Sequence, residues 1–342
     1  MMPHIFAANL VDRDGLNAPD GIALDSSANP PHLYVVDASN SRVLGWANAE
    51  GFTDGQPADL VFGQPDRWSS GCNSGGLSLA SLCIAGNLNG IAVDAHGTVW
   101  VSDHGNHRVL GYRSPFTTDT VADWMLGGIG CVAGPRGLCS PSGLAVDKGG
   151  NLYVADIVNN RILEFNEPTC RDAAADRVLG ARSLRQLGCT DEATCFSAPN
   201  GSHPGLEIYG GLLAIDAGGR LLVANNSAVY VFDQPLCPRA HSRKLIDLHE
   251  NSLYPLALGL AIDSAARIYV TLLSPYVYRF SKTGVPSALE LGESCTYGYS
   301  SGVPEGLGRA SLCSPSGLAV GPHDELFVSD AGVNRVVVFD NP

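Results

Sequence analysis

The chain has 342 residues and a formal net charge of −13, with 16% charged residues, 40 glycines and 21 prolines. This acidic balance, without any basic run, excludes a nucleic-acid partner, because phosphate binding needs clustered Lys and Arg. No stretch of about 18 apolar residues occurs, so we expect no membrane span, and the abundant Gly and Pro favour short strands joined by turns.

The first expected element is a strand at residues 4–11, and six copies of one repeated unit follow it. A typical unit opens with Gly-hydrophobic-Ala-hydrophobic-Asp and continues through a turn into a second strand, such as residues 99–102. A loop then leads to a third strand, such as residues 108–112. The six openings lie at Gly21, Gly90, Gly143, Leu212, Gly259 and Gly317. Because each copy is one supersecondary unit, the repetition predicts a continuous array.

A fourth strand follows five of the six units. These strands are expected at residues 59–63, 123–127, 177–180, 244–247 and 288–292. The last unit ends near Phe339 and has no room for one, so the N-terminal strand should join the C-terminal unit and close a ring. Closure of this kind leaves no open seam between the first and last units.

The repeated line resembles the NHL repeat. The resemblance rests on the Gly-hydrophobic-Ala-Val-Asp opening, the aromatic-Val-Ser/Ala-Asp strand end and the Asn-x-Arg-Val third strand. It is clear in units 1, 2, 3 and 6 and weak in units 4 and 5. It implies an all-β, six-bladed β-propeller with four antiparallel strands per blade, in agreement with the strand count, and a single NHL-type domain over residues 1–342.

Four units also repeat an Asp, a short loop and an Arg. A carboxylate can accept backbone N–H groups, and a guanidinium can bridge carboxylates and carbonyls. We therefore expect structural loop staples at Asp37 with Arg42, Asp103 with Arg108, Asp156 with Arg161 and Asp330 with Arg335. The alternative is a carboxylate ring that holds Ca²⁺ or a cationic ligand. It is disfavoured because each Asp comes with its own Arg.

The loops between second and third strands, and those between blades, should share one face, which carries the long insertions. Loops on a rigid scaffold usually hold the binding residues. The candidate ligand-binding residues on this face are His104, His107, Tyr209, Asn225, His249, Tyr254 and Tyr276. The histidine spacing matches no recognised metal-ligand pattern, so no metal is assigned. Units 4 and 5, which lack the staple, mark either sequence drift or a specialised sector.

The chain has ten cysteines. Eight form pairs within inter-blade loops, and the other two occupy matching positions of adjacent units. The expected disulfides are Cys72–Cys83, Cys131–Cys139, Cys189–Cys195, Cys295–Cys313 and Cys170–Cys237. Zinc or redox chemistry is disfavoured because no Cys-x₂-Cys occurs and the cysteines are not clustered with histidines. Five disulfides indicate an extracellular or periplasmic protein whose signal peptide has been removed.

The resemblance implies three functional classes, because NHL-like propellers include peptide-amidating lyases, hydrolase-like relatives and interaction domains. In the lyases, histidines that enter from the inner strands hold zinc. The corresponding positions here contain no histidine: Asp20, Asn89, Ser142, Gly211, Leu258 and Ser316. A nucleophile elbow is also missing from the sequence. The sequence thus favours a monomeric scaffold that binds a protein, peptide or glycan, with no cofactor predicted. The alternative is a divalent-metal-dependent lyase or hydrolase, with Ca²⁺ or another divalent ion in the channel.

Overall fold

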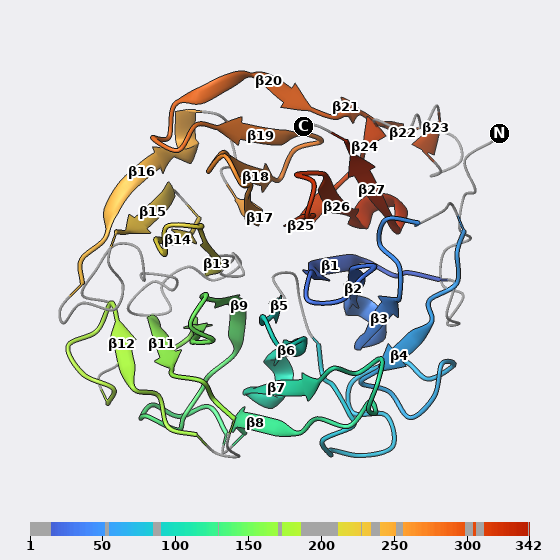
Figure 1. The fold of residues 1–342 in the computed structure, drawn as a ribbon, viewed down its shortest axis with the longest axis vertical. Coiled ribbons are helices and arrows are strands. Elements are labelled where there is room, and N and C mark those ends of the chain that lie inside the picture. The colour runs from blue at the N-terminus through green and yellow to red at the C-terminus, as the bar shows by residue number, and fades with distance from the viewer. Residues whose placement is uncertain are drawn as a thin grey trace.

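The computed structural model arranges six antiparallel sheets around a central axis (Figure 1). It describes residues 15–51, 55–84, 90–128, 130–169, 173–185, 211–226, 228–233, 240–250, 256–297, 304–305, 311–340 and 342. Over these ranges the regular structure is β-strand and short 3₁₀ turns, with no α-helix. None of the helical turns in the described part has the length and apolar character needed to span a bilayer.

The first three blades each contain four strands, which run in order from the central axis to the rim. Blade 1 contains β1 (Pro19–Asp25), β2 (His32–Asp37), β3 (Arg42–Trp46) and β4 (Leu60–Phe62). Blade 2 contains β5 (Ile91–Val93), β6 (Thr98–Asp103), β7 (Arg108–Arg113) and β8 (Trp124–Gly127). Blade 3 contains β9 (Pro141–Val146), β10 (Leu152–Asp156), β11 (Arg161–Phe165) and β12 (Arg177–Leu179).

Blades 4 and 5 repeat this arrangement, and blade 6 shows three strands among the described residues. Blade 4 contains β13 (Leu212–Ile215), β14 (Leu221–Ala224), β15 (Ala228–Phe232) and β16 (Arg243–Asp247). Blade 5 contains β17 (Ala257–Ile262), β18 (Ile268–Leu272), β19 (Val277–Phe280) and β20 (Pro286–Leu291). Blade 6 contains β25 (Pro315–Val320), β26 (Leu326–Asp330) and β27 (Arg335–Phe339).

Short elements lie in the loops between these strands. The 3₁₀ turns are η1 (Ala38–Asn40), η2 (His104–Asn106), η4 (Leu248–Glu250) and η5 (Ala331–Val333). The segment between blades 5 and 6 contains β21 (Glu293–Ser294), β22 (Thr296–Tyr297), β23 (Pro304–Glu305) and β24 (Ser311–Leu312). In this segment β21 pairs with β24 in parallel and β22 pairs with β23 antiparallel.

The expected all-β, six-bladed propeller is confirmed. The strand at residues 4–11 that was expected to complete blade 6 lies outside the described residues. Within the described part, blades 6 and 1 already meet: the Ser316 hydroxyl donates to Pro19 O at 2.8 Å, and Ala18 N–H donates to Asn334 Oδ1 at 2.8 Å. These bonds join residues 297 and 316 positions apart in the sequence and connect the last blade to the first.

The hydrophobic core lies between adjacent blades. In β10 all five residues are buried, as in a strand covered on both faces, which is why alternation is weak in the sequence. Between blades 1 and 2, Phe62 packs against Tyr112 with ring centroids 4.5 Å apart. Full burial of one large apolar side chain contributes about 1.5–3 kcal/mol, so these layers supply the main favourable term of folding.

The repeated glycine that opens the blades has a packing cause. A Cβ at Gly143 would lie 2.0 Å from Gly211 O of the next blade, and a Cβ at Gly317 would lie 2.1 Å from Asp20 O. Real Cβ atoms do not approach a backbone oxygen so closely, so the innermost strands pack backbone against backbone. The repetition of glycine therefore reflects contact between neighbouring blades.

Candidate functional site

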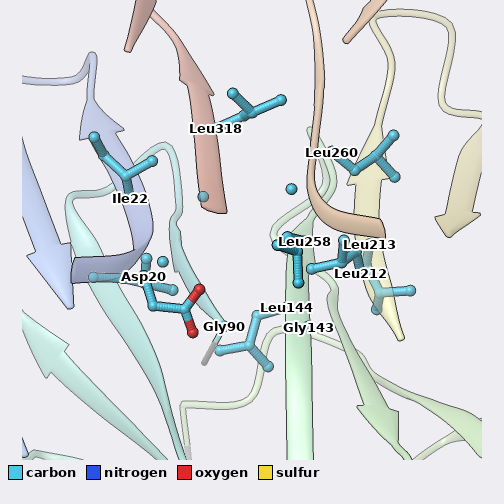
Figure 2. Close-up of a pocket in the computed structure, with 14 residues that line it drawn as sticks. Asp20, Ile22, Gly90, Gly143, Leu144, Leu212, Leu213, Leu258, Leu260 and Leu318 are labelled. Atoms are coloured by element: carbon cyan, nitrogen blue, oxygen red, sulfur yellow. The ribbon is translucent and has the colours of Figure 1, made fainter. Parts of the chain in front are cut away.

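The central channel is narrow and mostly apolar. Its cavity measures about 70 Å³, well below the roughly 300–1,000 Å³ of ordinary small-molecule sites. Leu212 and Leu258 line it together with backbone from the other inner strands, as Figure 2 shows. Among the described lining residues, Asp20 carries the one charged side chain, and it is buried. The channel thus has room for a few waters or an ion.

The four Asp–Arg pairs lie at the ends of the second strands, where the long-loop face begins. We use this name for the face formed by the loops between blades and the loops between second and third strands. In blade 3, Asp156 accepts bonds from Arg161 Nε at 2.7 Å, Asn159 Nδ2 at 2.8 Å and Cys139 N–H at 2.7 Å. Arg161 Nη2 in turn donates to Gly134 O and Gly137 O. These bonds hold the preceding inter-blade loop onto the blade.

The other three pairs make the same kind of contact at different distances. The Arg Nε–Asp Oδ2 distance is 2.6 Å for Arg42 with Asp37 and 2.5 Å for Arg108 with Asp103. It is 3.3 Å for Arg335 with Asp330, and there the arginine side chain is 18% exposed. In all four blades the arginine also donates to carbonyls of the preceding loop or segment. The tightest contacts therefore occur in blades 1 to 3.

Burial sets the charge balance of these pairs. In Asp37 and Asp156, removal from water is the largest influence and raises the carboxyl pKa above its ordinary value. The adjacent guanidinium, Asn side chain and backbone N–H all act in the opposite direction by stabilising the ionised form. These donors therefore offset part of the cost of burying the two carboxylates.

Three of the expected disulfides are present: Cys72–Cys83, Cys131–Cys139 and Cys295–Cys313. The other two, Cys189–Cys195 and Cys170–Cys237, fall outside the described residues. In each described bridge the second cysteine also donates its backbone N–H to the staple aspartate of the following blade, Asp103, Asp156 or Asp330. The covalent bridge and the ion pair therefore meet at one residue.

The structure brings His104 and His107 together at the junction of blades 2 and 3. His104 Nδ1 lies 3.3 Å from Pro141 O, and Ser140 N–H donates to His107 Nδ1 at 3.1 Å. Burial lowers the pKa of His104, and the neighbouring His107 acts in the same direction. Both rings thus contact the start of blade 3.

His107 also lies beside the disulfide of the same junction. One of its ring nitrogens and the sulfurs of Cys131 and Cys139 all lie within 4.8 Å of one another. The sequence reasoning that set the cysteines apart from the histidines is therefore wrong at this place. Residues 107 and 131 are 24 positions apart, and contact between two blades brings them together. No signal in the sequence reports that contact.

The remaining candidates belong to blades 4 and 5. Asn225 is buried and accepts the Ala228 N–H at 3.2 Å, which closes its own hairpin turn. His249 is exposed, and Tyr276 is partly exposed in the loop after β18. Tyr209 and Tyr254 lie outside the described residues. That these five residues form one binding sector stays a prediction.

The sequence analysis did not identify several exposed apolar residues of the long-loop face as candidate binding residues. Trp68 is 65% exposed and Leu77 is 66% exposed, both in the loop between blades 1 and 2. Val132 and Val158 are also exposed, and a hydrogen bond from Asn159 Nδ2 to Val132 O connects their two loops. The signal that could have found them is the occurrence of large apolar residues inside long Gly- and Ser-rich loops.

The opposite face holds a second cavity of about 220 Å³ between blades 3 and 4, lined by the turns at Asp147 and Asp216 and by Tyr153. Behind it, Glu164 is fully buried and is the cross-strand partner of Tyr153. Neither carboxylate oxygen of Glu164 has a hydrogen-bond partner among the described residues, and Arg177 Nε lies 4.0 Å away. Burial raises the pKa of Glu164 above its usual value.

The arrangement of the blades defines the protein as a six-bladed β-propeller, and three of its segments match the NHL repeat. The sequence model of the NHL repeat matches residues 86–112, 138–165 and 312–339, which cover units 2, 3 and 6. A comparison with curated proteins finds no match.

Several solved structures share the fold. A streptogramin B lyase is 11% identical with a TM-score of 0.52, and the match covers 98% of this chain and 83% of that chain. A gluconolactonase from Xanthomonas campestris is 15% identical with a TM-score of 0.51, covering 94% and 85%. A protein of unknown function from Bacteroides thetaiotaomicron is 15% identical with a TM-score of 0.57, covering 95% and 70%. Such low identity shows the fold alone.

Proposed function

We propose that the protein is a secreted or periplasmic propeller that binds a protein, peptide or glycan through its long-loop face. The observation that carries the proposal is the exposure of Trp68 and Leu77 on a well-anchored loop. Large exposed apolar groups on an ordered surface favour association, because a partner removes their surface from water. The Arg67 guanidinium lies 6.0 Å from the Trp68 ring centroid, which adds a cationic group to the aromatic surface.

The loop that carries these side chains is held in place before any partner arrives. Gln64 Nε2 lies within hydrogen-bond distance of three carbonyls, those of Asn40, Ser41 and Gly71, which share its two hydrogens. Asn73 exchanges side-chain bonds with Asn106 at 2.8–2.9 Å, and the Cys72–Cys83 bridge closes the loop. A preformed binding loop loses less conformational entropy on association, which favours affinity.

The cysteines support the proposed compartment. Three bridges at the predicted pairings support an oxidising environment. Comparison of intact mass with and without reductant tests the full set, since each bridge gains two hydrogen atoms on reduction. Ten free thiols in the purified protein would contradict the assignment.

The binding proposal is tested on peptide and glycan arrays with the whole protein and two variants, Trp68→Ala and Leu77→Ala. The matched control is Val285→Ala, which removes a valine that is 61% exposed in a turn on the opposite face. For a ligand found on the array, we expect Trp68→Ala to weaken binding about tenfold or more, as at other interface anchors. A ligand that binds all variants equally would contradict the assignment of this face.

The second candidate function is a divalent-metal-dependent lyase or hydrolase at the channel mouth. The specific observation in its favour is the Asp20 carboxylate, which lies in the channel among leucine side chains (Figure 2). The similar lyase and gluconolactonase structures add only the fold. Elemental analysis after dialysis separates the candidates: a stoichiometric metal that is lost in Asp20→Asn supports the enzyme, and its absence from the wild-type protein supports the binding scaffold.

A further inference from the structure

We propose that the junction of blades 2 and 3 holds a latent binding site for a thiophilic divalent cation of the zinc type. The site is formed by His107, Cys131 and Cys139 after the disulfide is reduced. It lies on the long-loop face, in a different inter-blade loop from Trp68 and Leu77, and it does not depend on the binding function proposed above. Among the described residues, these three form the one group of potential ligands whose donor atoms all lie within 4.8 Å of one another.

The donor set fits a soft or borderline metal. Two thiolates and one imidazole form a Cys₂His set, which leaves the fourth tetrahedral position to solvent or substrate. Zinc–sulfur and zinc–nitrogen bonds of about 2.0–2.3 Å place tetrahedral ligand atoms roughly 3.5–3.8 Å apart. After reduction the two sulfurs, now at bonding distance, must separate to about 3.8 Å. The imidazole nitrogen already lies within 4.8 Å of both sulfurs, so the required movements are small. Hard cations such as Ca²⁺ prefer oxygen and do not fit this set.

The loop keeps its position without the S–S bond. Cys139 N–H donates to Asp156, and Arg161 holds the carbonyls of Gly134 and Gly137. On the other side, Ser140 N–H donates to His107 Nδ1 and fixes the ring beside the sulfurs. Because these contacts belong to the staple and the strand start, reduction leaves the three ligands facing one another.

Solvent exposure also favours reduction of the Cys131–Cys139 bridge. Cys131 is exposed whereas Cys139 is buried, so an incoming thiolate reaches the Cys131 sulfur from solvent. Two equivalents of a thiol reductant are consumed and form the reductant's own disulfide, and Cys131 and Cys139 each gain a hydrogen. On metal binding each thiol releases one proton to solvent as its metal–sulfur bond forms.

The test measures alkylation of individual cysteines by mass spectrometry, after mild reduction of the whole protein with glutathione and with or without Zn²⁺. The variants are wild type, His107→Ala and the control His96→Ala, which removes an exposed histidine of the opposite face. Cys72 and Cys83 serve as an internal control, because no histidine is grouped with them in the described structure.

We expect Zn²⁺ to slow alkylation of Cys131 and Cys139 about tenfold or more in wild type and His96→Ala, since loss of even a supporting contact weakens metal sites by 10–100-fold. In His107→Ala the protection should be lost. With Co²⁺ the wild type should show thiolate charge-transfer absorption that His107→Ala lacks. Equal protection in His107→Ala, equal protection at Cys72 and Cys83, or no protection at either pair would each overturn the proposal.

Discussion

Removal of the Asp156 carboxylate tests the view that the Asp–Arg pairs hold the inter-blade loops onto the blades. Asp156 and Arg161 are both 0% exposed, and the carboxylate accepts three bonds of 2.7–2.8 Å. In Asp156→Ala the guanidinium stays buried without its counter-charge, and Cys139 N–H loses its acceptor. Breaking a buried pair in this way destabilises proteins by about 3–5 kcal/mol.

The assay is urea unfolding of the oxidised protein at neutral pH, together with thermal unfolding. For a chain of this size each kcal/mol shifts Tm by about 1.4 °C, so we expect a decrease of about 4–7 °C. The matched control is Asp330→Ala, whose partner Arg335 is 18% exposed and 3.3 Å away. Asp330 is itself 0% exposed, but water reaches the Arg335 side chain, so removal of this carboxylate should destabilise by only about 1–2 kcal/mol. A loss below about 1 kcal/mol in Asp156→Ala, or a larger loss in Asp330→Ala, would refute the reasoning.

Three further outcomes are expected. Gly143→Ala places a Cβ 2.0 Å from Gly211 O and should destabilise by about 2–3 kcal/mol in urea unfolding. In the control Gly218→Ala the nearest atom lies at 3.2 Å, so stability should change by less than about 1 kcal/mol. Equal effects of the two substitutions would contradict the backbone packing. Since the folded-state pKa of Glu164 is raised above the unfolded value, its ionised form destabilises the fold at neutral pH. Wild type should therefore gain stability relative to Glu164→Gln as the pH is lowered through the folded pKa towards the unfolded value, and a constant difference between pH 7 and pH 5 would disprove this. Replacing both cysteines by Ser should destabilise by about 2.5 kcal/mol for Cys131–Cys139 and about 3 kcal/mol for Cys295–Cys313, whose sequence separations are 8 and 18; a gain in thermal stability from either change would contradict the loop-closure argument.

The fold could be predicted because its determinants are local and repeated. The opening glycines, the strand pattern and the Asp–Arg spacing recur in each clear unit. The same packing and loop-anchoring requirements therefore leave the same residues at several places in the sequence. The cysteine pairs at short separation predicted the three described bridges for the same reason. Repetition in the sequence thus identifies the structural features that the blades share.

The candidate site could be predicted only in part, because its contacts are made between blades and occur once. His107 lies close to Cys131 at the junction of blades 2 and 3, and no periodic pattern in the sequence predicts that contact. The buried Glu164 is likewise a single departure from the repeat, visible only when its surroundings are known. Features that belong to one blade pair need the three-dimensional structure.

The backbone contacts of the innermost strands determine how such a channel can change. Since Gly143 and Gly317 touch the oxygens of the next blade, the bore is set by main-chain spacing and not by side-chain size. Substitutions beside these glycines can alter what projects into the axis, as Asp20 and Leu258 do, while the ring keeps its diameter. A new specificity can thus arise at the axis without rebuilding the blades, and blade 4, where Leu212 takes the glycine position, shows that one departure is tolerated.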